Sequence, residues 1–408
     1  MQEIEGGVTA AKGFMAAGLR AGVKPGKENK DMAMIVSEVP AVSAGTFTRN
    51  VVKAAPVLVD QKTVADYETA RAIVINSGNA NACTGAAGIE NVKATMAEVS
   101  RVLSIKKEEV LVCSTGVIGQ QLPVDVILKG CGMLKEELTK DKKGAFDAAE
   151  AILTTDTHKK QVAVKIKIDG KEVVIGAMCK GSGMIHPNMG TMLGFITTDA
   201  AISKELLQKA LSDVVEDTFN MVSVDGDTST NDTVLVLANG LAKNPCIEEE
   251  KEAYFLFKSG LFYICEALAK MIAGDGEGCT RLFEVTALGA ATKQDAKILS
   301  KAVVTSSLTK AAVFGKDANW GRIICAMGYS GVTFDPEAVD ITLESEAGRI
   351  DLVKEGLATD YSEELATEIL SQNPVRAYVN VHMGTYEATA WGCDLTYEYV
   401  SINADYRS

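Results

Sequence analysis

Apolar residues recur along this chain with two different spacings. Over residues 162–168 they alternate with polar residues, Asp169 and Gly170 follow, and a second apolar run covers residues 172–178. Alternation with a period of two is typical of a strand with one buried face, and an Asp-Gly pair favours a tight two-residue turn. These residues therefore predict a β-hairpin.

Short uninterrupted apolar runs predict further strands, at residues 72–75, 111–113, 192–197 and 233–237. The first run enters the glycine- and asparagine-rich stretch NSGNANACTGAAG, and the second enters STGVIG. A buried strand followed by such a loop is expected to expose backbone N–H groups at its end.

The spacing changes to that of a helix after Ser203. Positions 206, 207, 210, 211, 214 and 215 are all apolar and would lie on one helix face, and Ser203 is suited to cap the first turn. Further helices are predicted for residues 250–272, with an end at Gly274, and for residues 293–305. Residues 376–399 are expected to be rich in strands.

The length of 408 residues exceeds that of a typical single domain. No low-complexity linker or fixed-period repeat marks a boundary, so the division is only weakly indicated. We expect a large domain over residues 1–280 and a smaller one over residues 281–408.

Composition narrows the classes of function. Hydrophobic residues make up 47% and charged residues 23%, which is ordinary for a globular protein, and the net charge is −13. An acidic surface repels nucleic-acid phosphates and anionic lipids, so neither is an expected partner. The N-terminal MQEIEGGVTA lacks the apolar stretch of a signal peptide, and no apolar run is long enough to span a membrane. We therefore expect a cytoplasmic protein.

Cysteine and histidine limit the possible chemistry. The nine cysteines are odd in number, widely spaced and free of CxxC pairs, which argues against a disulfide framework and against a metal site, so buried free thiols are expected. A Ser-His-Asp or Cys-His arrangement would need one of only three histidines, His158, His186 and His382. His186 lies within residues 180–200, close to Thr191, and a structural role is the more common one for such a residue.

The segment with the clearest chemical meaning is KGSGMIHPNMGTMLGFITTDA, residues 180–200. Gly190 has no Cβ and precedes Thr191, and an apolar strand follows; this arrangement suits attack of the Thr191 hydroxyl on the carbonyl of Gly190. The released α-amine of Thr191 could then act as the local general base, without a histidine. From the Gly-Thr dipeptide alone, a polar residue at the start of a strand is the more common explanation.

The wider pattern resembles the ornithine acetyltransferase family, the bifunctional glutamate N-acetyltransferases of arginine biosynthesis. Eight blocks look like those of the family and occur in its order. One departure is Gly190, where many members carry alanine, which is also small. The blocks are NSGNANACTG (76–85), CSTGVIG (113–119), LTTDT (153–157), KGSGMIHPNMGTML (180–193), SVDGDTSTNDT (223–233), GDGEGCTR (274–281), FGKDANWGRI (314–323) and NADYRS (403–408).

The resemblance implies an α/β fold of the self-cleaving, N-terminal-threonine type. It is a layered sandwich of stacked β-sheets covered by helices, with a smaller α/β C-terminal domain. Autocatalytic cleavage between Gly190 and Thr191 would give an α chain of residues 1–190 and a β chain of residues 191–408. The family usually assembles these chains as an α2β2 heterotetramer.

The resemblance also implies roles for individual residues. Thr191 matches the nucleophile, and Thr115 and Gly116 match the oxyanion hole, where preorganised donors stabilise a tetrahedral intermediate. Lys180 suits a substrate carboxylate and Glu277 a substrate ammonium group. Thr155 remains an alternative to Thr154. The positions that match substrate-binding residues are Thr154, Lys180, Thr191, Glu277, Asn403 and Ser408.

The implied reaction is ping-pong transfer of an acetyl group from N2-acetylornithine to Thr191 and then to glutamate. It needs no cofactor, and bifunctional members also accept acetyl-CoA as donor. A self-processed hydrolase and a non-enzymatic amino-acid-binding protein remain the alternatives. Two other motifs are weaker: Asp225-Gly-Asp-Thr-Ser lacks the glycine and glutamate of a calcium loop, and GDGEG lacks the GK[ST] ending of a phosphate loop.

Overall fold

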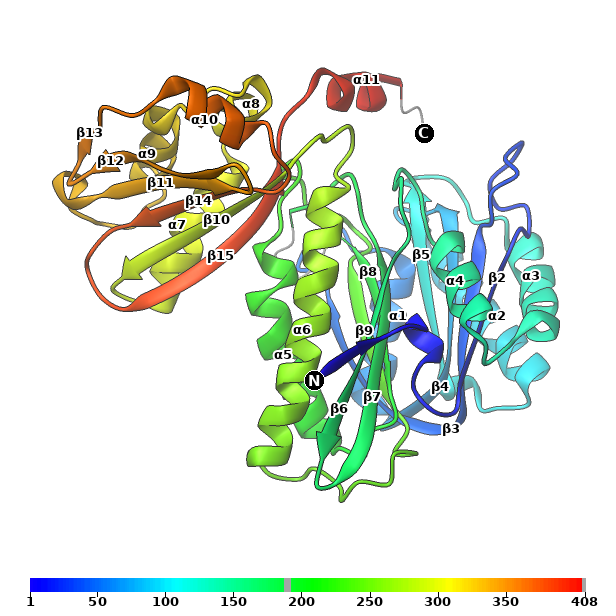
Figure 1. Ribbon diagram of the computed structural model, residues 1–408. Coiled ribbons are helices and arrows are strands. Elements are labelled where there is room, and N and C mark those ends of the chain that lie inside the picture. The colour runs from blue at the N-terminus through cyan, green and yellow to red at the C-terminus, as the bar shows by residue number, and fades with distance from the viewer. Residues whose placement is uncertain (187–191, 406–408) are drawn as a thin grey trace.

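The structure is a computed structural model that describes residues 1–186 and 192–405. The described part of the chain contains two β-sheets, which lie in different parts of the molecule (Figure 1). The strands of the larger sheet all precede residue 239, and those of the smaller sheet all follow residue 281. The boundary that we predict at residue 280 falls between helix α6 (Glu252–Gly274) and strand β10 (Leu282–Ala290).

Nine strands form the larger sheet in the described part of the chain, in the order β1-β6-β7-β8-β9-β3-β4-β5, with β2 paired to β3. Pairs β8–β9 and β4–β5 are parallel, and the others are antiparallel. The strands are β1 (Gln2–Ile4), β2 (Phe14–Leu19), β3 (Met32–Phe47), β4 (Thr69–Asn79), β5 (Val110–Val117), β6 (Lys160–Ile168), β7 (Lys171–Lys180), β8 (Leu193–Thr198) and β9 (Thr233–Ala238).

The long strand β3 links the two halves of this sheet. Its first part pairs with β2 and β4, its last part pairs with β9, and the register with β4 shifts between Val36 and Ala41. Side chains on one face, such as Ile73 of β4, Leu111 of β5 and Phe195 of β8, share a buried cluster. The two halves thus stack on each other, with helices on both outer faces (Figure 1). This is the layered sandwich that the resemblance implies.

Different helices cover the two outer faces. Apolar residues of α5 and α6 pack on the half that contains β6–β9, and those of α2 and α3 pack on the half that contains β3–β5. The alternation of apolar residues in each strand supplies one side chain to the interior and the next to a helix. Besides α6, the α-helices of this part are α1 (Ala55–Asp66), α2 (Gly85–Leu103), α3 (Val124–Glu137), α4 (Lys142–Ala151) and α5 (Lys204–Asp217).

The smaller sheet has the strand order β13-β12-β11-β14-β10-β15. Only β10 and β14 are parallel within it, and α7 packs on its face. Its further strands are β11 (Asp340–Ser345), β12 (Gly348–Lys354), β13 (Leu357–Ala358), β14 (Val375–Asn380) and β15 (Tyr386–Cys393). Its helices are α7 (Lys293–Thr305), α8 (Ser307–Gly315), α9 (Trp320–Gly328), α10 (Glu363–Leu370) and α11 (Tyr397–Asp405).

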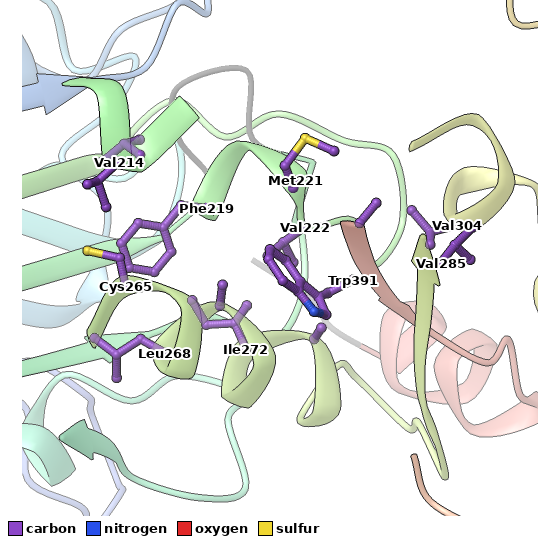
Figure 2. Close-up of a cluster of buried hydrophobic side chains, with 14 of the residues drawn as sticks. Val214, Phe219, Met221, Val222, Cys265, Leu268, Ile272, Val285, Val304 and Trp391 are labelled. Carbon is purple, nitrogen blue, oxygen red and sulfur yellow. The ribbon is translucent and has the colours of Figure 1, made fainter. Parts of the chain in front are cut away.

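One hydrophobic core joins the two parts of the molecule. Trp391 of β15 lies in this cluster with Ile272 of α6 and Val304 of α7 (Figure 2). Its indole N–H donates to Oε1 of Glu284 at 3.2 Å, and its carbonyl accepts from the N–H of Ser223 at 2.9 Å. The smaller part is therefore anchored beside the end of α6.

Several predicted elements are confirmed. The hairpin is β6–β7, and Asp169 and Gly170 take the positive φ angles of 47° and 78° that a two-residue turn requires. The Ser203 Oγ accepts from the N–H of Leu206 at the start of α5, and α7 has the predicted bounds. Residues 376–399 are less uniform than expected, because α11 begins at Tyr397.

The described residues also bear on the cysteines and on membrane crossing. All nine cysteines are free, but Cys83, Cys246 and Cys325 are exposed, which corrects the expectation that the thiols are buried. Among the described helices, none combines the length and apolar character needed to cross a membrane.

Candidate active site

A cavity of about 150 Å³ lies where the ends of β5 and β7 meet the loop after α6 and the C-terminal helix α11. It brings together six of the residues predicted from the sequence. Thr155 also lines it, so the structure does not separate Thr155 from Thr154. The six are Thr115, Gly116, Thr154, Lys180, Glu277 and Asn403.

Gly190, Thr191 and Ser408, which we also predict to act in the site, lie outside the described residues. Met192 and Leu193 follow Thr191 directly in the sequence, and both line the cavity. The chain segment that contains the candidate nucleophile therefore continues along the cavity wall.

Gly116 lies at the end of β5, where the backbone of the neighbouring strand approaches closely. It pairs with Gly78 of β4, and its φ angle is +131°. A Cβ at this position would lie 2.3 Å from the carbonyl carbon of Gly78, so only glycine fits without moving one of the two strands. The packing of two glycines thus positions the candidate oxyanion hole.

Polar side chains behind β5 fix its end, and the sequence prediction missed them. The Oγ of Ser114 donates to Oδ1 of Asn76 at 2.6 Å. The Nδ2 of Asn231 donates to the carbonyl oxygens of Ala80 and Ser114 at 2.6 and 2.8 Å. The asparagines of NSGNAN and of TND are visible in the sequence, but no sequence rule predicts which residues so far apart in the chain will contact one another.

Lys180 is a buried cation in the cavity wall. It ends β7, only 7% of its surface is exposed, and its Nζ lies 3.9 Å from Oδ2 of Asp156. The side chain of Asp156 is fully buried and does not line the cavity. Burial by itself would raise the pKa of the Asp156 carboxyl, but Lys180 and Lys160 outweigh it and lower that pKa well below its ordinary value, so the group is charged.

Glu277 is a buried anion in the cavity wall. Asn403 of α11 donates from Nδ2 to its Oε2 at 2.7 Å. A Cβ on Gly183 would lie 2.3 Å from the Glu277 carboxyl carbon, so the glycine makes room for the carboxylate. A Cβ on Gly278 would lie 2.7 Å from the N of Tyr399. Close packing beneath α11 thus explains Gly278, the last glycine of GDGEG.

The turn that contains Asp225 holds the chain before residue 187. Its Oδ2 and Oδ1 accept from the N–H groups of Met184 and Ile185 at 2.7 and 2.8 Å, and burial raises the pKa of the carboxyl. His186 lies 3.0 Å from the Oγ of Ser223 through Nδ1, and burial lowers its pKa to about 4. No group of three or more metal-ligating side chains occurs among residues 1–186 and 192–405.

Lys24 is a further charged group near the cavity that the sequence prediction missed. Its Nζ donates to the carbonyl of Leu153 at 2.7 Å, next to Thr154. Burial lowers its pKa to about 8, and the charge of Lys180 also contributes to the lowering.

The whole chain is similar in sequence to known proteins. A family model described as "ArgJ family" matches residues 15–408. The arginine biosynthesis bifunctional protein ArgJ of Caldanaerobacter subterraneus is 49% identical over 408 residues, which is 100% of both chains.

Two solved structures are also similar. The crystal structure of the arginine biosynthesis bifunctional protein ArgJ from Bacillus halodurans is 50% identical, with a TM-score of 0.51, and the match covers 53% of this chain and 100% of that one. The ornithine acetyltransferase of Mycobacterium tuberculosis, solved with ornithine, is 43% identical, with a TM-score of 0.42, and the match covers 46% of this chain and 95% of that one.

Proposed function

Since the chain belongs to the ArgJ family, we propose that it is an acyltransferase of arginine biosynthesis that transfers an acetyl group from N2-acetylornithine to glutamate. The observation that carries this proposal is the convergence of Thr115, Gly116, Lys180 and Glu277 on one cavity. These four residues come from three strands or loops far apart in the sequence, and they combine backbone and hydroxyl donors with one buried cation and one buried anion.

The reaction begins with attack of the Thr191 Oγ on the acetyl carbonyl of the donor. The α-amine of Thr191 takes the hydroxyl proton, and the negative oxygen that develops is stabilised by the Thr115 hydroxyl and the Gly116 N–H. Collapse of the tetrahedral intermediate breaks the C–N bond, the leaving amine takes a proton, and ornithine departs. The acetyl group is then held as an ester on Thr191.

The amine of glutamate attacks this ester in the second half of the reaction. The same oxyanion donors serve again, and Thr191 is regenerated as N-acetylglutamate leaves. Lys180 binds a carboxylate of the substrates, while Glu277, held by Asn403, accepts from an ammonium group. One site can serve donor and acceptor in turn, because both carry the α-amino-acid skeleton.

Self-cleavage before Thr191 belongs to the same proposal, because the α-amine exists only after cleavage. The crystallised Bacillus halodurans chain supports it indirectly: the whole of that chain matches 53% of this one. Residues 191–408 are 218 of 408 residues, which is the same share. We further propose that the fragments assemble as α2β2 in the cytoplasm, that no cofactor is needed, and that acetyl-CoA is a second donor.

Intact-mass spectrometry of the purified protein tests this function. We expect two fragments that meet between Gly190 and Thr191, and incubation with N2-acetylornithine alone should add the mass of one acetyl group to the second fragment. Added glutamate should then remove that group as N-acetylglutamate. A single unmodified chain would contradict the proposal, and release of acetate in place of N-acetylglutamate would indicate a hydrolase.

A further inference from the structure

Four buried side chains of alternating charge lead away from the cavity. The Nζ of Lys180 lies 3.9 Å from Oδ2 of Asp156, whose Oδ1 lies 2.8 Å from the Nζ of Lys160. The same Nζ lies 2.5 Å from Oδ2 of Asp275. No side chain of the four is more than 8% exposed. Of these residues only Lys180 lines the cavity.

The Asp156 carboxylate also connects two walls of the cavity, because it accepts hydrogen bonds from backbone N–H groups of both. The N–H of Gly181 donates to its Oδ1 at 2.6 Å, and the N–H of Thr154 donates to its Oδ2 at 3.1 Å. The first donor follows Lys180 directly, and the second belongs to a residue that lines the cavity. A single carboxylate therefore fixes the end of β7 relative to the loop that contains Thr154.

Lys160 extends this connection to the third wall. Its partner Asp275 stands two residues before Glu277, in the loop after α6. This loop is held further by Ser182, whose Oγ donates to the carbonyl of Asp275 at 2.7 Å and whose carbonyl accepts from the N–H of Glu277 at 3.1 Å. The positions of the site cation and the site anion are thus coupled through buried charges.

The row of four charged side chains also affects the charge of Lys180. A buried ammonium group without a counter-ion is strongly unfavourable and tends to lose its proton, whereas a buried pair keeps both charges. The charged groups around Asp156 come from separate segments: Lys24, Lys160 and Lys180, with Asp275 beyond Lys160. Asp156 is therefore the carboxylate that offsets the positive charges of Lys180 and Lys160, with Lys24 also nearby.

We propose that Asp156 and Lys160 are positioning residues. They keep Lys180 charged, and they hold the walls that carry Thr154, Lys180 and Glu277 in fixed relative positions. This inference rests on the proposed function for its meaning in catalysis. Its physical content, the dependence of the Lys180 charge on Asp156, can be measured without any turnover.

The test compares Asp156→Asn with a matched control, Asp199→Asn. Asp199 is also buried and accepts from two backbone N–H groups, those of Val174 at 2.8 Å and Lys12 at 3.3 Å, but the lysine whose charge acts on it is Lys12 and not Lys180. Acetic anhydride acetylates an amine only in its neutral form, and peptide mass spectrometry reports the fraction of Lys180 that is modified. At one fixed pH, Asp156→Asn should raise the modification rate of Lys180 about tenfold. Asp199→Asn should leave it unchanged.

A second variant is expected to change the modification rate of Lys180 in the opposite direction. It tests the inference even if Asp156→Asn does not fold. Lys160→Met leaves Lys180 as the main counter-ion of Asp156, so modification of Lys180 should slow. In steady-state kinetics, Asp156→Asn should raise the Michaelis constant for glutamate about tenfold or more, increasingly so at higher pH, with a smaller change in kcat.

Unchanged modification of Lys180 in a folded Asp156→Asn protein would overturn the inference, as would an equal change in Asp199→Asn or faster modification in Lys160→Met. The proposed function fails separately: in that case the wild-type protein transfers no acetyl group, whatever the modification rates are.

Discussion

Replacement of Gly116 by alanine tests how the candidate oxyanion hole is built. The new Cβ would lie 2.3 Å from the carbonyl carbon of Gly78 and 2.5 Å from the N of Asn79, and both are backbone atoms that cannot rotate away. The φ angle of +131° adds strain for any residue with a Cβ. The variant can fold only if β4 and β5 move apart.

The expected loss of stability follows from the backbone clash and from the strained φ angle. A non-glycine residue in such a backbone conformation costs about 1–3 kcal/mol, and overpacking costs about 1–3 kcal/mol more. We therefore expect the free energy of unfolding to fall by about 2–6 kcal/mol. Displacement of the Gly116 N–H removes one oxyanion donor, which should lower kcat by about 100- to 1000-fold.

Gly119→Ala is the matched control for this variant. Gly119 also has a positive φ angle, +85°, but nothing lies within 4 Å of a Cβ placed on it. This variant should lose only about 1 kcal/mol of stability and keep its kcat. Urea unfolding and the initial rate of acetyl transfer would be measured on both proteins. A Gly116→Ala enzyme within threefold of the wild-type kcat, or an equal loss in Gly119→Ala, would refute the reasoning.

Four further predictions follow from the same structure. Thr191→Ala should remain one full-length chain that transfers no acetyl group, and intact-mass spectrometry with a transfer assay would reveal a cleaved or active variant. Gly183→Ala should push the Glu277 carboxylate out of place and raise the Michaelis constant for N2-acetylornithine about tenfold or more, with less effect on kcat; an unchanged constant would contradict this. Trp391→Ala should lower the free energy of unfolding by about 3–5 kcal/mol in urea titrations, because the indole fills the core that joins the two parts; a loss below 1 kcal/mol would argue against a shared core. Because burial lowers the pKa of His186 from 6.5 to about 4, its contribution to stability is fully present above pH 6.5 and is lost as the pH falls toward 4, so His186→Asn should unfold with a shallower pH dependence in that window.

Local patterns predicted the elements that depend on local interactions. The hairpin β6–β7 follows from alternation and an Asp-Gly turn, and α5 and α7 follow from apolar spacing and capping residues. The helices α1 to α4 were not predicted. The N-terminal cap positions of all four lack a side-chain hydrogen bond, and α1 has little apolar periodicity, so the usual start signals are weak there.

In the candidate site, too, some residues could be predicted from the sequence and others could not. The resemblance to a family identified Thr115, Gly116, Lys180 and Glu277 as site residues, and the structure places them around one cavity. Their supports, such as Asp156 beneath Lys180 and Gly183 beside Glu277, depend on distances between segments that no spacing along the sequence encodes. Burial also determines which lysines and aspartates are paired, and burial is a property of the folded chain.

The strand order has a consequence for how such a protein can be made. Strands β8 and β9, which follow Thr191, lie between β7 and β3, which precede it. In a cleaved chain the first fragment would therefore supply both flanks of the larger sheet, and the second fragment would supply the two strands between them. Neither fragment alone could complete the sheet. If the chain is cleaved as we propose, folding would therefore come before cleavage, and the two products would stay associated without a covalent bond between them. On this proposal the uncut chain would bring the nine described strands of the larger sheet together before the cut, and fragments 1–190 and 191–408 expressed separately should not reproduce the enzyme when they are mixed.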